Sequence, residues 1–274
     1  MARLQAQAGT AAPMEAVRQL LDQGWCVVAD VLTPAESAEA LARLWTAAER
    51  WRARGNDTHM PVLDPNAANV RVFDLIDLDP LFRDLIRRPV AMALVRALLG
   101  PDAMISNFTA NIARPGSRSM SLHSDQALVV PEPWLEPWSI NIIWCLTDVT
   151  PANGATLFIP GSHRVTRRAD LGADPGARLV PFEAKAGSII AMDGRVWHTS
   201  GANVTTDQDR ALLFGYYSRG FLRPQVNWNA VLSEATQGAL DRELRWLLGL
   251  DGAANLSLAG ELLAADLAGS RRGG

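Results

Sequence analysis

Hydrophobic and polar residues in the first hundred positions follow the helical period of amphipathic segments. Residues 14–23 are predicted to form a short helix, and the apolar run 25–31 is typical of a strand. Thr33-Pro34-Ala35-Glu36 then predicts the start of a longer helix that runs to about residue 54. In this segment threonine caps, proline fits the first turn and glutamate completes a capping box. Helical spacing returns at 79–99, where a proline interrupts it and a glycine closes it.

After residue 100 the pattern changes to short apolar runs separated by glycine, proline, asparagine and aspartate, which is typical of strands and turns. Helices followed by a run of strands favour a β core with helices packed outside it. Residues 128–138 fit neither pattern and contain three prolines, so we expect a lid or a substrate-contacting loop there. The predicted strands are 103–113, 139–146, 156–159, 188–192 and 210–218.

The chain shows no internal repeat and no obvious linker. Residues 1–13 are predicted to be a flexible N-terminal tail. Residues 55–70 are predicted to form a loop, and helical spacing returns at 232–249 and 256–268. We therefore expect a single domain over 14–274 that carries a C-terminal helical extension.

Composition and charge narrow the class of protein. Among 274 residues, 48% are hydrophobic and 20% are charged, which is typical of a soluble globular domain. The net charge of -3, without a basic stripe, argues against nucleic acid or an anionic membrane surface as a partner. No stretch reaches the length of a membrane span. Cys26 and Cys145 lie in apolar runs and are expected to be buried thiols in a reducing compartment, so we predict a cytoplasmic protein.

Candidate chemistry begins with His123-Ser124-Asp125. On an extended strand alternate side chains share a face, so the imidazole and the carboxylate would point the same way. The strand after the Asp193-Gly194 turn would deliver His198 to the same place. Two histidines and one carboxylate can hold a metal by one face, which leaves adjacent positions open and suits Fe(II) oxygen chemistry. The two-residue spacing alone is common by chance, and the alternative is an exposed strand edge with His198 as a core histidine.

The remaining basic and imidazole side chains are assigned one by one. Arg210 lies twelve residues after His198, where a guanidinium can clamp a carboxylate through two parallel hydrogen bonds. His163 follows a strand in a proline-glycine turn and is expected to be structural. His59 lies in a polar loop and is given no role.

A known family matches this pattern. The ordered set of His123-Ser124-Asp125, His198 and Arg210, with the Asn-Gly and Pro-Gly-Ser-His segments inside Asn153–His163, resembles the phytanoyl-CoA dioxygenase family of Fe(II)/2-oxoglutarate oxygenases. The resemblance covers about residues 14–228. It implies a mainly β fold with flanking helices, built on a double-stranded β-helix, the jelly-roll core of cupins.

The resemblance also implies which residues act. It assigns the iron ligands as His123, Asp125 and His198, with 2-oxoglutarate and O2 as co-substrates. It assigns the remote carboxylate of 2-oxoglutarate to Arg210, Ser200 and Thr156, with Gln126 as a further candidate. Some family members add a lysine on an early core strand, and this chain has no lysine placed there. We expect a neutral amide to take its place, Asn107 or Asn111.

The implied activity is oxidation of a C–H bond by hydroxylation or by a related oxidative cyclisation, epimerisation or desaturation. We expect an apolar, cyclic or polyketide-like small molecule of secondary metabolism as substrate. Lys185 is the only lysine, and so strong a preference for arginine indicates a GC-rich bacterial genome. The expected substrate contacts are Trp134, Trp138, Phe73 and Arg223, with Trp144, Trp228, Arg219 and Gln225 as pocket, core or surface residues.

Two other classes of protein remain open from the sequence. A zinc- or other metal-dependent hydrolase or isomerase of the cupin type can use the same three ligands with a bound water. Such an enzyme needs no dicarboxylate clamp, so Arg210 and Ser200 argue against it. A non-catalytic family member is expected to lack a ligand, and all three are present. The oligomeric state is left open.

Overall fold

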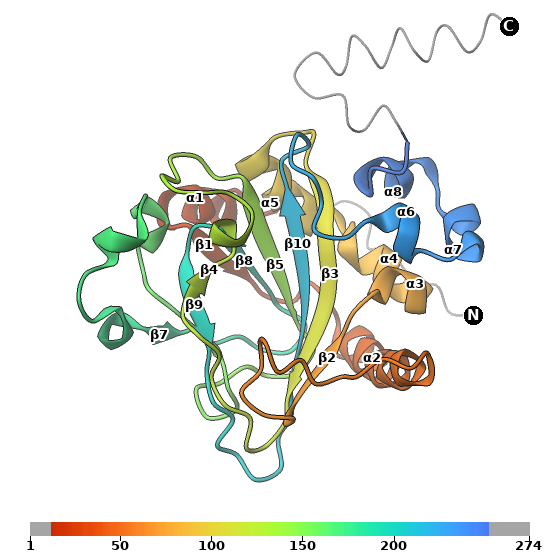
Figure 1. Cartoon of the computed structure of the whole chain (residues 1–274), viewed down its shortest axis with the longest axis horizontal. Coiled ribbons are helices and arrows are strands. Elements are labelled where there is room, and N and C mark those ends of the chain that lie inside the picture. The colour runs from red at the N-terminus through yellow and green to blue at the C-terminus, as the bar shows by residue number, and fades with distance from the viewer. Residues whose placement is uncertain (1–11, 252–274) are drawn as a thin grey trace, which may run out of the picture.

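The computed structural model describes residues 12–251, in which two antiparallel sheets face each other (Figure 1). The large sheet has the order β1 (Trp25–Val28), β8 (Ile189–Asp193), β5 (Ser139–Cys145), β10 (Arg210–Ser218), β3 (Met104–Ala113) and β2 (Asn69–Val72). The small sheet has the order β4 (His123–Ser124), β9 (Trp197–Ser200), β6 (Thr156–Phe158) and β7 (Val180–Pro181). Apart from the pairs β2–β3 and β6–β7, neighbouring strands are not consecutive in the chain, which crosses repeatedly between the two sheets.

Helices cover the outer face and one edge of the large sheet, as Figure 1 shows. The helices α1 and α5 contact each other and β8, while α2 lies against β2 and both α3 and α8 contact β3. Their bounds are α1 (Met14–Gln23), α2 (Pro34–Ala53), α3 (Leu75–Leu78), α4 (Pro80–Ile86), α5 (Pro89–Leu99), α6 (Trp228–Val231), α7 (Glu234–Ala239) and α8 (Arg242–Leu247).

Alternation of side chains divides the large sheet into two apolar faces. The outer face joins the helices in one core and includes Phe108, Ala110, Ile142, Trp144 and Leu213. The inner face forms a second core with the small sheet. This core includes Ile143, Cys145, Ile190 and Leu212 of the large sheet, together with Phe158 and Phe182. Toward β3 and the ends of β10, the inner face carries polar side chains instead, and a cavity lies there between the sheets.

Most predicted elements are confirmed within one to three residues. The capping box of α2 is complete, because Thr33 accepts from the Glu36 amide and the Glu36 carboxylate accepts from the Thr33 amide. The strand predicted over 25–31 ends at Val28, and Asp30 adopts a left-handed conformation with φ 54°. The loop predicted over 55–70 ends two residues earlier, because residues 69–72 form β2.

The C-terminal part differs from its prediction. Residues 232–249 form two short helices rather than one. The side chain of Ser233 caps the start of α7, and that of Asp241 caps the start of α8. The helix predicted at 256–268 and most of the tail predicted at 1–13 lie outside the described residues. Among residues 12–251, no helix combines the length and apolar character needed to cross a membrane.

His163 is a packing residue of the fold, in agreement with its expected structural role. Its side chain is buried and lies against Gly24, which ends α1 with φ 81°. The neighbouring Arg164 guanidinium donates to the carbonyl oxygen of Asp22 at 2.8 Å. The turn that follows β6 is therefore bound to the end of the first helix.

We predict that Gly24→Ala lowers the free energy of unfolding substantially. A Cβ at this position would lie 2.5 Å from His163 Cγ, and the positive φ adds strain of its own. Gly55→Ala is a matched control, because Gly55 has φ 84° and no atom within 4 Å of the added Cβ. In denaturant unfolding, Gly24→Ala should cost about 1–3 kcal/mol more than the control. Equal costs would show that His163 is not packed as described.

Candidate metal centre

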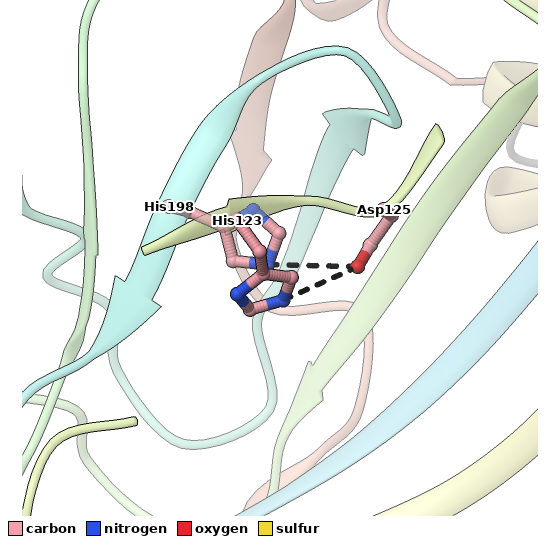
Figure 2. Close-up of side chains that lie close together, drawn as sticks. All are labelled: His123, Asp125 and His198. Atoms are coloured by element: carbon pink, nitrogen blue, oxygen red, sulfur yellow. Dashed lines mark ion pairs between the residues drawn. The ribbon is translucent and has the colours of Figure 1, made fainter. Parts of the chain in front are cut away.

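Two histidines face each other because of strand pairing in the small sheet. The strands β4 and β9 pair in a register that sets His123 opposite His198, with ring centroids 4.3 Å apart. Figure 2 shows both rings turned toward the carboxylate of Asp125. The Asp125 Oδ1 atom lies 3.6 Å from His123 Nε2 and 3.7 Å from His198 Nε2.

Asp125 reaches this place by a different route from the one expected. The predicted extended strand ends at Ser124, and Asp125 has helical angles, φ −61° and ψ −36°, at the start of a 3₁₀ turn over Gln126–Leu128. The turn is fastened to the loop before β9, since Ser124 Oγ and the Gln126 amide both donate to the carbonyl of Gly194 at 2.8 Å. The segment that carries His123 and Asp125 is thereby held against the segment that carries His198.

Main-chain contacts set the protonation of both imidazoles. His123 Nδ1 lies 2.9 Å from the carbonyl oxygen of Ser121, and His198 Nδ1 lies 3.0 Å from that of Val196. A carbonyl oxygen only accepts, so Nδ1 carries the proton in each ring. The Nε2 lone pairs are left free and point toward the same space as Asp125, which is the usual arrangement of histidine ligands.

The charges at the site also favour metal binding. Burial lowers the pKa of His198 to about 4, so this imidazole is neutral near pH 7. Burial opposes ionisation of Asp125, yet the two imidazoles and the Asn141 amide hold the pKa of its carboxyl at about 2. Burial also acts against a charged His123, but Asp125 outweighs it and raises the pKa of that imidazole. A bound metal cation would take the place of the His123 proton as the positive partner of the Asp125 carboxylate.

The donor set fits a single divalent metal with open coordination positions. One atom from each of His123, Asp125 and His198 lies within 4.8 Å of the others, and no fourth histidine, cysteine or acid among residues 12–251 belongs to the group. Two nitrogens and one oxygen on one side suit Fe(II), and they also suit zinc. The open side faces the cavity, which the three residues line.

A buried guanidinium lies in the same cavity. Arg210 begins β10, is only 1% exposed and donates from Nη2 to Asn111 Oδ1 at 3.0 Å. Its Nε has no hydrogen-bond partner, and no carboxylate of the described residues pairs with it. Burial lowers the pKa of Arg210 to about 10, so the group stays charged at neutral pH. A buried cation without a counter-ion is suited to bind an anion.

Two hydroxyl groups lie on the cavity wall formed by the small sheet. Thr156 of β6 is directly opposite Ser200 of β9, and both side chains line the cavity together with Arg210. Ser200 Oγ accepts a hydrogen bond of 3.0 Å from the Met120 amide. The structure therefore brings the three expected carboxylate-binding residues to one cavity.

The other two candidates for cosubstrate binding have different positions. Asn107 lines the cavity, but its Nδ2 donates to Gln225 Oε1 at 3.2 Å, whereas Asn111 contacts Arg210. The Gln126 side chain lies outside the cavity lining and binds the backbone of the following loop. Its Nε2 donates to the Glu136 carbonyl and its Oε1 accepts from the Trp138 amide.

None of the four expected substrate contacts lines this cavity. Trp134 packs against Trp197 and donates to the Val130 carbonyl. Trp138 packs against Phe221, Phe73 packs against Trp51, and Arg223 lines a separate depression beside Trp228. Trp144 and Trp228 belong to the helix-covered core, and Arg219 donates to a loop carbonyl. The apolar cavity wall consists instead of Leu63, Met120, Leu128 and Phe214, with Gln225 beside it.

Sequence reasoning missed several polar groups of this cavity, including Arg71 and Asn141. Arg71 of β2 lines it, and its guanidinium forms a bidentate ion pair with the buried Asp64 at 2.6 and 2.9 Å. Asn141 of β5 lines it as well, next to Asp125. A lone amide inside the apolar run Ile140-Asn141-Ile142 was a usable signal for Asn141. Arg71 gave no such signal, because the sequence predicted no strand over 69–72.

Comparison with known proteins agrees with this arrangement. The profile of the phytanoyl-CoA dioxygenase family matches residues 20–211. Dioxygenase af480 of Aspergillus fumigatus is 52% identical over 236 residues, which cover 86% of this chain and 76% of that protein.

Two solved structures share the fold. The non-haem α-ketoglutarate-dependent carbocyclase SnoK from nogalamycin biosynthesis superposes with a TM-score of 0.65 at 20% identity, over 81% of this chain and 93% of that one. The epimerase SnoN, in complex with Fe3+, α-ketoglutarate and nogalamycin RO, superposes with a TM-score of 0.60 at 21% identity, over 77% and 86%.

The fold and the site together define a jelly-roll protein with a two-histidine, one-carboxylate group at the open end of its two sheets, and the predicted core is confirmed. The chain belongs to the phytanoyl-CoA dioxygenase family.

We predict that His198→Gln abolishes tight binding of Fe(II). Loss of a direct ligand should weaken binding by more than the roughly 100-fold typical of groups that only support a ligand. His163→Gln is the matched control, since His163 is equally buried but belongs to the Gly24 contact. Anaerobic equilibrium dialysis would measure both dissociation constants. Loss of binding in both variants, or in neither, would contradict the ligand assignment.

Proposed function

We propose that this chain is an Fe(II)/2-oxoglutarate-dependent dioxygenase that oxidises a C–H bond of an apolar small molecule. One observation carries the proposal. The ligand group His123, Asp125 and His198 and the buried, unpaired guanidinium of Arg210 open into one cavity. A metal site requires only the three ligands. A dicarboxylate that also chelates the metal explains the buried guanidinium of Arg210.

The two ends of the cavity have different tasks in this proposal. His123, Asp125 and His198 would hold the metal, which supplies activation of O2 together with 2-oxoglutarate. At the other end, Arg210 binds the remote carboxylate of the cosubstrate, with Thr156 and Ser200 as hydroxyl partners. The charge of Arg71 is balanced by Asp64, so Arg210 is the stronger anion site of the two. The protein orients the cosubstrate and keeps water away from it.

The substrate end of the cavity favours apolar molecules. Leu63 and Leu128 approach it from two different loops and remain 37% and 67% exposed, so a bound apolar ligand would cover them. Phe214 and Met120 continue the apolar wall. We propose a cyclic or polyketide-like metabolite as substrate. Related jelly-roll structures from antibiotic biosynthesis, a carbocyclase and an epimerase, support this choice.

The class of reaction is hydroxylation or a related cyclisation, epimerisation or desaturation. A zinc-dependent hydrolase or isomerase could use the same ligands, but it would leave the buried charge of Arg210 without a purpose. We also propose a cytoplasmic location, which the free and buried thiols of Cys26 and Cys145 support.

We predict a weak visible charge-transfer band when the protein is titrated anaerobically with Fe(II) and 2-oxoglutarate. Such a band requires chelation of the metal by the keto acid, so it reports both cofactors before any substrate is known. Substrates would then be found by succinate release. A protein that binds Fe(II) without the band would favour the hydrolase or isomerase alternative.

We predict that Arg210→Met weakens binding of 2-oxoglutarate by about 10- to 100-fold, because a charged hydrogen bond is worth about 1.5–3 kcal/mol. Fe(II) affinity without 2-oxoglutarate should stay near that of the unaltered chain. Arg114→Met is the control, since Arg114 is an exposed arginine 3.9 Å from Asp209. Titration of the charge-transfer band measures the affinity. An unchanged value for Arg210→Met would refute the clamp.

A further inference from the structure

Asn141 is a polar residue of the large sheet whose side chain touches the carboxylate of a candidate metal ligand, Asp125. It lies in β5 opposite Tyr216 of β10, in a row that continues to Asn107 of β3. Its side chain lines the cavity and is 7% exposed. Burial of an amide is unfavourable unless hydrogen bonds compensate it, so its presence among isoleucines needs a reason.

The contacts of Asn141 fix how its amide is oriented. Nδ2 donates to Asp125 Oδ2 at 3.1 Å. A carboxylate only accepts, so the amide cannot be turned the other way. The Oδ1 atom of Asn141 is buried, and no donor among the described residues reaches it. Among residues 12–251, the carboxylate of Asp125 is thus the only side chain that holds the amide.

This contact separates the two oxygens of Asp125. Oδ2 is bound by Asn141, while Oδ1 lies 3.6 and 3.7 Å from the two imidazole Nε2 atoms. A carboxylate with both oxygens free can chelate a metal and take two coordination positions. With Oδ2 hydrogen-bonded to the amide, Oδ1 is the oxygen that faces the two imidazoles.

We propose that Asn141 is a positioning residue that makes Asp125 a one-oxygen ligand. The inference rests on the proposed function. A six-coordinate metal held by two imidazoles and one carboxylate oxygen would have three positions left, enough for a chelating 2-oxoglutarate and O2. Chelation by both oxygens of Asp125 would fill one of these positions. Asn141 therefore preserves the vacancy that the chemistry requires, without binding the metal itself.

A merely structural role is distinguishable from this one. The main chain of Asp125 has its own anchor, because the Tyr216 hydroxyl donates to the Asp125 carbonyl at 3.3 Å. Removal of the Asn141 amide therefore frees the carboxylate but leaves the backbone held. Leucine is close to asparagine in size, so Asn141→Leu removes the amide without opening a cavity at position 141.

The first test is Fe(II) affinity in the absence of 2-oxoglutarate. Asn141→Leu should raise the Fe(II) dissociation constant by about 10- to 100-fold, as is typical for partners of metal ligands, while the melting temperature does not fall. Thr109→Val is the matched control, since it removes a polar group from the same cavity without contact to Asp125 and should bind Fe(II) normally. Tyr216→Phe should have a smaller effect than Asn141→Leu. If Asn141→Leu misfolds, Asn141→Thr replaces it.

The second test uses Co(II) as a probe, because its visible absorption reports coordination number. The spectrum of Asn141→Leu should differ from that of the unaltered chain, and the spectrum of Thr109→Val should not. Unchanged Fe(II) affinity and an unchanged Co(II) spectrum in Asn141→Leu would overturn the inference. Failure of the unaltered chain to bind Fe(II) would overturn the proposed function instead, so the two failures are distinguishable.

Discussion

The pairing of β4 with β9 is the constraint on which the metal centre depends. It sets His123 opposite His198, and main-chain carbonyls of the same segments hold the proton of each ring on Nδ1. The carbonyl of Gly194 then ties the turn that carries Asp125 to the loop before β9. The backbone thus sets the ligand geometry, so little conformational entropy is left to lose when a metal binds.

Buried charge divides the cavity into two ends. At one end the Asp125 carboxylate is balanced by two imidazoles and by the Asn141 amide. At the other end Arg210 is buried with only a neutral amide as partner. A charge buried in a medium of low polarity is stable only when it is paired. A cation bound by Asp125 and an anion bound by Arg210 would therefore pair both buried charges.

Aromatic residues hold the loops of this protein more than they form its cavity. Trp134 and Trp138 belong to the loop over 128–138, yet their rings pack toward Trp197 and Phe221. Gln126 fastens the same loop through two backbone hydrogen bonds. The composition of the loop indicated many aromatic contacts, but not their direction. Direction depends on which strand lies beneath the loop, and a single sequence does not contain that information.

The sequence by itself determined the local elements and indicated the candidate ligands. The capped helix α2, the strands of the β core and the set His123, Asp125, His198 and Arg210 follow from periodicity, capping and motif order, which depend on neighbouring residues. Only the tertiary structure decided which other side chains share the cavity. Arg71 and Asn141 reach it through strands distant in the chain, and Asn141 meets Asp125 because β5 lies beside the metal ligands. Such contacts depend on strand order and register, which arise when the whole chain packs.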